Sequence, residues 1–182
     1  ATGVNAIVDG QSQQVDADEI ILSAGAIHTP AILRRSGIGK RAELERFGIP
    51  IVAELPVGDN LVDHSAIWLG ITIKPEHRVP DLAFRHTNCC VRYSSGLAGA
   101  GRNDMILVSM NNSGMDDAGR ESGRLIVATF QTFSRGSVRL ASLDPVVHPN
   151  IDLNMLSDER DLVRMRDGVR LSLIHISSPR DS

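Results

Sequence analysis

The sequence has few aromatic residues and no long apolar run. Aromatic residues make up 3% of its 182 positions. Because protein sites for trimethylammonium groups usually use aromatic faces, this scarcity argues mildly against such a ligand. No apolar run approaches the roughly 18 to 20 residues that cross a bilayer, and the N-terminus lacks the basic and apolar regions of a signal peptide. We therefore expect no transmembrane segment.

Cysteine is also scarce. The two cysteines, Cys89 and Cys90, are adjacent, which is poor geometry for a disulfide and supplies too few ligands for a metal site. We expect two reduced thiols in a strand. Four histidines show neither metal-ligand spacing nor a paired acid, and are interpreted as surface or loop residues: His28, His77, His86 and His148. The sequence predicts no metal site.

An excess of basic residues is absent as well. The net charge is −3, and the Lys and Arg residues are scattered, which argues against a nucleic-acid partner. Gly99-Ala100-Gly101 lacks the third glycine and the preceding strand of a dinucleotide fingerprint, so we interpret it as a loop. Hydrophobic residues make up 42% of the chain, enough to bury a core.

Short strands and helices are predicted before residue 65. The stretches "GVNAIV" (3–8) and "ADEIILSAG" (17–25) are predicted strands of a hairpin that turns at Asp9-Gly10. Thr29 is predicted to cap a helix that begins at Pro30 and ends at Gly37. A second helix is predicted over 40–47, ending at Gly48.

Residues after 65 are predicted to be rich in strands. Five stretches with β-branched or aromatic residues are expected to form one antiparallel sheet: 66–74, 89–95, 104–111, 124–133 and 136–142. An amphipathic helix is predicted from Ser157 to Leu171, with Leu162, Met165 and Val169 on its apolar face.

One motif matches a known signature. Gly25-Ala26, Thr29-Pro30, Ile32-Leu33 and Ser36–Gly39 stand at the spacing of the second signature of the glucose-methanol-choline (GMC) oxidoreductases, over residues 25–39. The flanking "AELERFGIPIVAELPVGDNLVDH" and the later "SRGSVRLASLDPVVHPNIDLNMLSDERDL" also resemble that family. The chain is therefore identified as similar to GMC oxidoreductases of the choline or alcohol dehydrogenase type, up to about Leu171.

The resemblance implies a fold class and a domain organisation. We expect an α/β (α+β) two-domain flavoprotein, with part of an FAD-binding Rossmann-like domain and a substrate domain built on an antiparallel sheet. The expected domains are 1–64 (FAD), 65–150 (substrate) and 151–171 (the start of the C-terminal region). The last stretch, "SLIHISSPRDS" (172–182), resembles translated read-through of a sequencing adapter, and we predict a non-native tail there.

The resemblance also implies the cofactor and the reaction. The cofactor would be FAD, and a primary or secondary alcohol would be oxidised to an aldehyde or ketone by hydride transfer to flavin N5. Ser23, Ala24, Gly25 and Ala26 have side chains too small to hold a dinucleotide away from the backbone, and are predicted to contact FAD. A strand-to-helix turn packed against neighbouring backbone is the structural alternative.

A second cluster follows at Asn60, Asp63 and His64. By the resemblance, Asn60 is a candidate flavin contact, and His64 and Ala66 are candidates for the substrate side. Helix capping by Asn60 and Asp63, with a buried hydrogen bond from His64, is an equal alternative. In choline-oxidising relatives an acidic residue stands at the position of Ala66, which also argues against choline.

The family's Gly-x-Gly-x-x-Gly turn and its catalytic histidine are not in the sequence, so we predict no catalytic residue in this chain. The chain is expected to be an internal fragment that is inactive by itself. A flavoprotein of another class and a non-catalytic relative stay open as alternatives. We expect a cytoplasmic protein, peripheral to a membrane if its electron acceptor is a quinone. The alcohol, the acceptor and the oligomeric state are left open.

Overall fold

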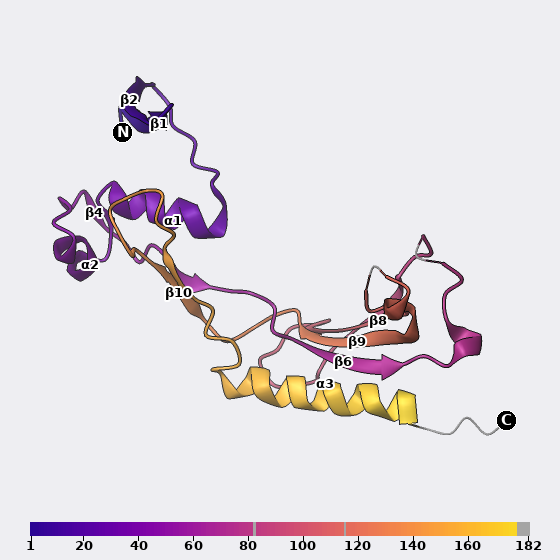
Figure 1. Cartoon of the computed structure of the whole chain (residues 1–182). Coiled ribbons are helices and arrows are strands. Elements are labelled where there is room, and N and C mark those ends of the chain that lie inside the picture. Colours follow the sequence, from indigo (N-terminus) through magenta and orange to yellow (C-terminus); the bar gives the residue numbers. More distant parts are fainter. Residues whose placement is uncertain (82, 115, 178–182) are drawn as a thin grey trace. The chain divides into compact units, whose positions relative to one another are not determined.

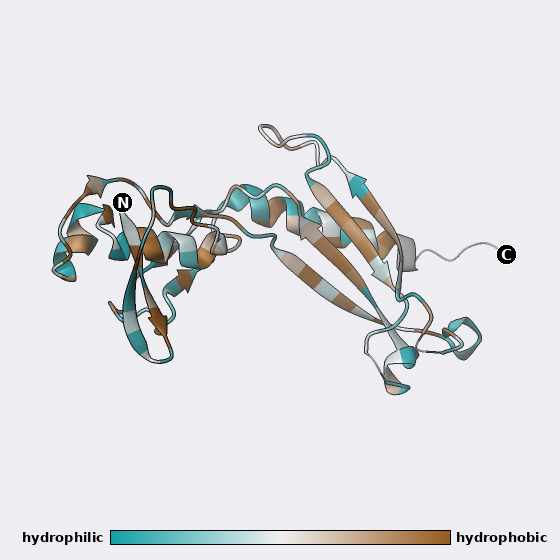
Figure 2. Cartoon of the chain, turned by 90° about the horizontal axis from the view of Figure 1, so that it is seen from above, coloured by the Kyte–Doolittle hydropathy of each residue, from teal (hydrophilic) through white to brown (hydrophobic). Residues whose placement is uncertain are grey.

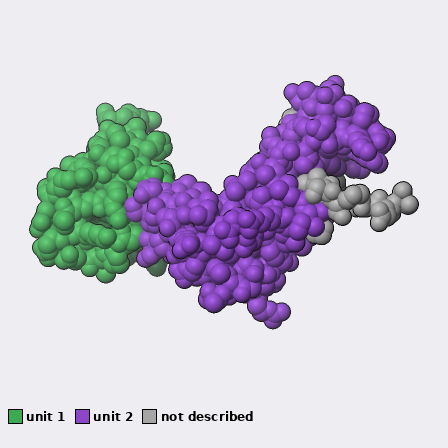
Figure 3. All heavy atoms as spheres, turned by 90° about the horizontal axis from the view of Figure 1, so that it is seen from below, with its two compact units in different colours: residues 1–59, 138–151 green, residues 60–137, 152–182 purple. Residues whose placement is uncertain are grey.

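Two compact units make up the structure, a computed structural model that describes residues 1–81, 83–114 and 116–177 (Figure 1). Unit 1 consists of residues 1–59 and 138–151, and unit 2 consists of residues 60–137 and 152–182 (Figure 3). The domain boundaries that the family resemblance implies, after residues 64, 150 and 171, differ from the limits of these units. They refer to the domains of a longer protein and stay a prediction.

Unit 1 begins with a hairpin of β1 (Gly3–Val8) and β2 (Gln11–Asp16), paired antiparallel from Gly3↔Asp16 to Val8↔Gln11. The predicted turn is confirmed, because Asp9 and Gly10 both have positive φ, at 51° and 77°. The predicted second strand over 17–25 is wrong. Residues 17–23 form no strand or helix and pair with no strand in the described part of the chain, so their backbone lacks the ladder that a strand needs.

Helix α1 (Gly25–Arg35) starts five residues earlier than predicted. The N-cap position is Ala24, no side chain caps the helix, and Pro30 lies inside it. The prediction that Thr29 caps the helix is therefore wrong. The predicted end is confirmed, since Ser36 is the C-cap and Gly37 has a φ of +85°. A Cβ at Gly37 would overlap the carbonyl oxygen of Pro50, so the chain passes too closely there for a side chain.

Helix α2 (Arg41–Arg46) and a short parallel pair, β3 (Ile38–Gly39) and β4 (Ala53–Glu54), complete the first segment of unit 1. The predicted end of the second helix is confirmed, with Phe47 as C-cap and a positive φ of 66° at Gly48. A three-stranded sheet has the order β11-β10-β5, from β5 (Asp59–Leu61), β10 (Gly136–Arg139) and β11 (Asn150–Asp152).

Unit 2 is built on a four-stranded antiparallel sheet in the order β6-β9-β8-β7. Its strands are β6 (Ala66–Thr72), β7 (Thr87–Tyr93), β8 (Met105–Met110) and β9 (Ser122–Thr129). Four of the five predicted strands are thus in one antiparallel sheet, as expected. The fifth is not, because β10 pairs with β11 and β5 instead. Two short 3-10 helices, η1 (Pro75–His77) and η2 (Ala118–Glu121), lie in the connections.

Helix α3 (Glu159–Ser177) covers one face of this sheet (Figure 1). Met165 of the helix packs against Met105, Leu107 and Val127, and these four buried side chains form the core of unit 2. Gly168 allows the close approach, since a Cβ there would lie 2.7 Å from Cγ1 of Val127.

The predicted apolar face of this helix is partly wrong. Met165 is buried and Val169 packs against the core, but Leu162 is 52% exposed. The buried stripe of the helix runs instead through Asp161, Arg164, Met165, Gly168 and Ser172. The helix continues into the predicted non-native tail as far as Ser177, and residues 178–182 lie outside the described residues. The mixture of sheets and helices confirms the α/β class.

Candidate functional site

The signature turn lies where the extended segment of unit 1 enters α1. Ser23, Ala24, Gly25 and Ala26 are all exposed, and Gly25 has a φ of +76°. No atom lies within 4 Å of a Cβ placed on Gly25. The turn is therefore not packed against neighbouring described backbone, which disfavours the structural alternative. The first turn of α1 has no acidic residue and no capping side chain, so its backbone N–H groups are not occupied by a cap.

A buried arginine fixes the other end of this helix. Arg34 is fully buried and donates hydrogen bonds to the carbonyl oxygens of Val57 and Val138, as well as to Glu43 Oε1 at 2.8 Å. Burial is the main cause that lowers the pKa of the Arg34 guanidinium, although Glu43 opposes it. One side chain thus ties α1 to α2 and to two later segments of unit 1, and positions the signature motif.

The segment with Asn60, Asp63 and His64 belongs to unit 2. Asn60 is exposed and has a positive φ of 59° within β5. Asp63 Oδ1 accepts a hydrogen bond of 2.8 Å from the backbone N–H of His64. No helix follows in this segment, so neither Asn60 nor Asp63 caps one, and His64 is exposed rather than buried. The capping alternative is therefore excluded for these residues.

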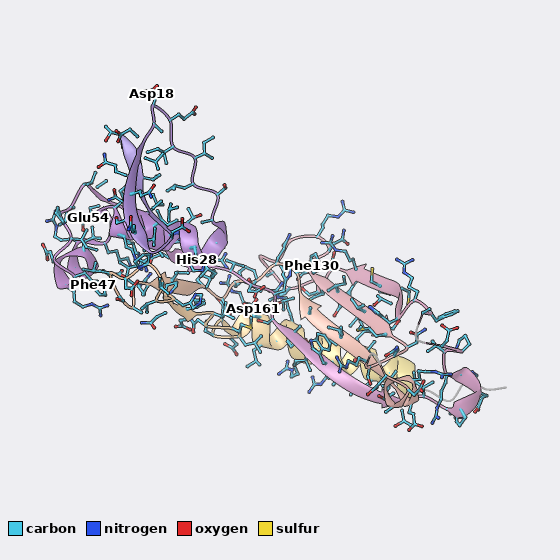
Figure 4. All side chains as sticks on the ribbon, turned by 45° about the horizontal axis from the view of Figure 1, so that its top comes forward. Asp18, His28, Phe47, Glu54, Phe130 and Asp161 are labelled. Atoms are coloured by element: carbon cyan, nitrogen blue, oxygen red, sulfur yellow. The ribbon has the colours of Figure 1, made fainter. Side chains whose placement is uncertain are left out.

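His64 contacts the aromatic ring of Phe130. Phe130, which is labelled in Figure 4, directly follows β9. The two rings are stacked, with centroids 4.5 Å apart and planes 12° apart. The guanidinium of Arg92 lies 4.5 Å from the centroid of the same ring. Ala66, the other substrate-side candidate, is exposed at the start of β6 and pairs with Ala128 of β9. His64, Phe130 and Arg92 form what we call the His64 stack.

A buried ionic network joins α3 to the sheet of unit 2. Arg164 donates hydrogen bonds to Asp104 Oδ2 at 2.7 Å and to Asp161 Oδ1, and all three side chains are buried. Ser134 donates to Asp161 through its hydroxyl, at 2.6 Å, and through its backbone N–H. Burial raises the pKa of both carboxyls, but hydrogen bonds, from Arg164 and Ser95 to Asp104 and from Ser134 and Phe133 to Asp161, outweigh it, so both pKa values lie below the ordinary value.

A cavity in the described part of unit 2 does not coincide with these residues. It measures about 460 Å³ and is lined by α3 and the segment after β7, with Tyr93, Ser95 and Asp167 among its polar side chains. None of the predicted site residues lines it. The volume of this cavity therefore gives no support to the predicted site.

The structure places the predicted site residues in two groups. Ser23, Ala24, Gly25 and Ala26 lie in unit 1, whereas Asn60, His64 and Ala66 lie in unit 2. Sequence analysis missed Arg34, Arg92 and Phe130. No local signal identifies them, because their contacts join residues 34 with 138 and 64 with 130, far apart in the chain. Cys89 and Cys90 are free thiols on β7, as expected, and Cys89 Sγ lies 3.0 Å from Ser109 Oγ.

Sequence models of GMC oxidoreductases match two parts of the chain. The N-terminal model matches residues 1–66 and includes the signature turn, and the C-terminal model matches residues 132–179. The chain belongs to the GMC oxidoreductase family. The C-terminal match extends past Leu171, where we expected the resemblance to stop, and includes most of the predicted tail.

Two curated relatives align with almost the whole chain. The 5-(hydroxymethyl)furfural oxidase of Methylovorus sp. (strain MP688) is 38% identical over 98% of this chain and 33% of that protein. Oxygen-dependent choline dehydrogenase 1 of Chromohalobacter salexigens is 31% identical over 98% of this chain and 37% of that protein. The GMC chain thus spans about a third of the length of these relatives.

Solved structures share the fold. Pyridoxine 4-oxidase from Mesorbium loti aligns with a TM-score of 0.82 and 25% identity over 97% of this chain and 36% of that protein. An FAD-dependent oxidoreductase from Chaetomium thermophilum aligns with a TM-score of 0.77 and 20% identity over 98% of this chain and 42% of that protein. The expected flavoprotein fold is confirmed, and so is FAD as the cofactor of this family. Among the helices that the structure describes, none combines the length and apolar character that crossing a bilayer requires.

Proposed function

We propose that this chain forms part of an FAD-dependent enzyme that oxidises a primary or secondary alcohol to an aldehyde or ketone. The observation that carries this proposal is the match of both GMC sequence models, in order, with the complete signature at residues 25–39. Because the chain spans about a third of its relatives, the activity is proposed for the whole protein. The chain by itself is proposed to be inactive, since it contains no candidate for the catalytic histidine of the family.

The residues of the signature turn fit a flavin nucleotide. Ser23, Ala24, Gly25 and Ala26 are small and exposed, and the uncapped first turn of α1 leaves backbone N–H groups free for polar or anionic ligand atoms. We assign these four residues to hold FAD, and Asn60 as a further flavin contact. When bound, FAD supplies the two-electron acceptor at N5. Arg34 is a positioning residue in this scheme, because it anchors the helix that begins at the turn.

The substrate side is assigned to the sheet of unit 2. His64 and Ala66 are exposed, two residues before β6 and at its start, where a substrate can contact them. The proposed domains are those that the family resemblance implies: residues 1–64 belong to the flavin domain, 65–150 to the substrate domain and 151–171 to the start of the C-terminal region. Ala66 supplies no negative charge at a position where we expect choline-oxidising relatives to have one.

The flavin assignment can be tested in a holoenzyme. We suggest replacing the aligned third of the Methylovorus sp. oxidase with this chain and introducing Ala26→Leu. A leucine at this exposed position would occupy the space next to the turn, so the flavin content of the purified chimera is expected to fall at least severalfold. The matched control is Ala42→Leu, at an exposed position of α2, which is expected to leave the flavin content unchanged.

The reaction is tested by mixing the flavin-loaded chimera anaerobically with benzyl alcohol and following flavin absorbance. Bleaching is expected, and the 182-residue chain mixed with FAD is expected to give none. Retained flavin without bleaching by any primary or secondary alcohol would contradict the proposed reaction. It would point to a non-catalytic relative or to a flavoprotein of another class. Equal flavin content in Ala26→Leu and Ala42→Leu would contradict the assignment of the turn.

A further inference from the structure

One face of the sheet in unit 2 is open. Helix α3 packs on the face that carries Met105, Leu107 and Val127. Since side chains alternate along a strand, the opposite face carries Ala66 and Trp68, and Trp68 is 54% exposed. Seen from above, the strands of this sheet carry hydrophobic bands (Figure 2). His64 and Phe130 lie next to the paired ends of β6 and β9, where Ala66 pairs with Ala128.

Both large aromatic rings of this open face are already paired with arginines. The guanidinium of Arg92 lies 4.5 Å from the centroid of Phe130, and that of Arg124 lies 5.0 Å from the centroid of Trp68. A quaternary ammonium group binds to the faces of such rings. On this face it would have to displace a guanidinium and approach a positive charge, so the arrangement disfavours cationic alcohols.

Among the residues that the structure describes, neither guanidinium group forms an ion pair on this face. Among the described residues, no carboxylate oxygen lies within 4.0 Å of Arg92 or Arg124, although the chain as a whole has a net charge of −3. Arg92 donates one hydrogen bond, of 3.0 Å, to the carbonyl oxygen of Asn103. The nearby carboxylate of Asp104 is buried and bound to Arg164 and Ser95. Arg92 is an exposed residue, and a guanidinium group is suited to a bidentate anion.

We infer that the His64 stack recognises the carboxylate of an alcohol substrate through the guanidinium of Arg92, and that the enzyme prefers anionic alcohols to neutral and cationic ones. The inference rests on the proposed function, which assigns His64 and Ala66 to the substrate side. Phe130 holds the Arg92 guanidinium in place and presents an apolar edge to the carbon skeleton. When FAD is bound, it would accept the hydride from the alcohol carbon, and a base elsewhere in the enzyme would take the proton from the hydroxyl oxygen.

The specificity experiment compares three alcohols in the flavin-loaded chimera: 4-(hydroxymethyl)benzoate, 4-methylbenzyl alcohol and choline. The benzoate is expected to have the highest kcat/KM and choline the lowest. Arg92→Gln is expected to lower kcat/KM for the benzoate roughly 10- to 100-fold, mainly through KM, because a hydrogen bond between charged groups is lost. The same variant should change kcat/KM for 4-methylbenzyl alcohol less than about threefold.

Arg102→Gln is the matched control, since Arg102 is also exposed but lies in the loop between β7 and β8. It is expected to leave all three alcohols unaffected. An equal loss for the benzoate and the neutral alcohol in Arg92→Gln would overturn the inference, because it would indicate a structural role. A wild-type preference for choline would also overturn it.

A binding measurement separates this inference from the proposed reaction. Benzoate, which cannot be oxidised as an alcohol, is titrated into the 182-residue chain and into the chimera while the NMR signals of His64 and Arg92 are followed. Saturable shifts of these signals are expected in both proteins, and the His64 shift is expected to disappear in Arg92→Gln. Such shifts without any alcohol oxidation would mean that the reaction is wrong and the anion site is right. Alcohol oxidation without such shifts in the chimera would mean that the reaction is right and the anion site is wrong.

Discussion

In unit 2, buried methionine, leucine and valine side chains form one cluster between the sheet and α3, whereas in unit 1 a fully buried arginine, Arg34, joins segments that are distant in the chain. The buried apolar residues of unit 1 are Ala31, Leu44, Val138 and Leu140. Its hairpin exposes Val4, Ile7, Val8 and Val15, each by 40% or more. In unit 2 the apolar cluster is supplemented by the buried network of Arg164.

The difference shows which interactions stabilise each unit. Burial of apolar area stabilises unit 2 in proportion to that area, and the ionic network adds directionality at the edge of the core. In unit 1 the signature helix is fixed mainly by Arg34, which binds two backbone carbonyl groups and one carboxylate. The part of the chain that carries the family signature is therefore ordered by a few polar contacts.

The largest loss in the free energy of unfolding is expected from Arg164→Met in unit 2. This variant leaves the buried carboxylates of Asp104 and Asp161 without their guanidinium, and breaking such a network by removing one partner costs about 3–5 kcal/mol. The free energy of unfolding is measured by urea denaturation with the fluorescence of Trp68, the only tryptophan in the chain, which lies in unit 2.

The control for this variant is Arg166→Met on the same helix. Arg166 pairs with Asp167 at 3.3 Å, and both side chains are 56% exposed, so the expected loss is below about 1 kcal/mol. Similar losses in both variants would contradict the importance of the buried network.

A smaller effect is expected from Arg34→Met in unit 1. The variant removes the guanidinium donor from the carbonyl groups of Val57 and Val138 and from the carboxylate of Glu43, with an expected loss of about 2–4 kcal/mol. Val138 keeps a hydrogen bond from Arg139, and Glu43 keeps one from the backbone N–H of Leu140. Glu43 is 10% exposed, so its charge is partly hydrated and the loss is smaller than for Arg164.

Hydrogen exchange of α1 and α2 amides measures this loss, because Trp68 does not lie in unit 1. Arg41→Met is the control, since Arg41 is 56% exposed and forms only exposed ion pairs with Glu45 and Glu54. Faster exchange in both variants to the same degree would show that Arg34 has no special role in unit 1.

The smallest expected effect is the decrease of folding stability at low pH. The pKa values of Asp104 and Asp161 are lowered in the folded chain, so the unfolded chain binds their protons at higher pH. Stability from these carboxyls is therefore complete above the ordinary Asp pKa and is lost as pH falls from about 5 toward 2. Urea midpoints of Trp68 fluorescence should decrease over this range. The decrease should be smaller in Asp104→Asn, and an unchanged pH dependence in that variant would contradict the role of Asp104.

Much of the local structure could be predicted from the sequence. Asp9-Gly10, Gly37 and Gly48 have the positive φ values that their turns and helix ends require. Four of five predicted strands pair in one antiparallel sheet. These features depend on residues that are neighbours in the chain, or on the alternation of apolar and polar side chains along a strand.

The site was only partly predictable. The contact of Ser23–Ala26 with FAD stays a prediction, and the signature motif identified the family, because a motif is a local pattern. It did not identify Phe130 or Arg92, since nothing in the neighbourhood of His64 in the chain indicates which ring will stack on it. The stripe of α3 was mispredicted for a similar reason: Arg164 and Asp161 look like surface residues until Asp104 and Ser134 provide partners for them.

The sequence by itself determined the turns, the helix ends, the extended segments of unit 2 and the family. Only the tertiary structure decided that residues 17–23 have no strand partner in the described chain, that β10 joins another sheet, and that two carboxylates and an arginine are buried beneath α3. The physical reason is that backbone torsions respond to adjacent residues, whereas ladder pairing and the burial of charge require partners that are distant in the chain.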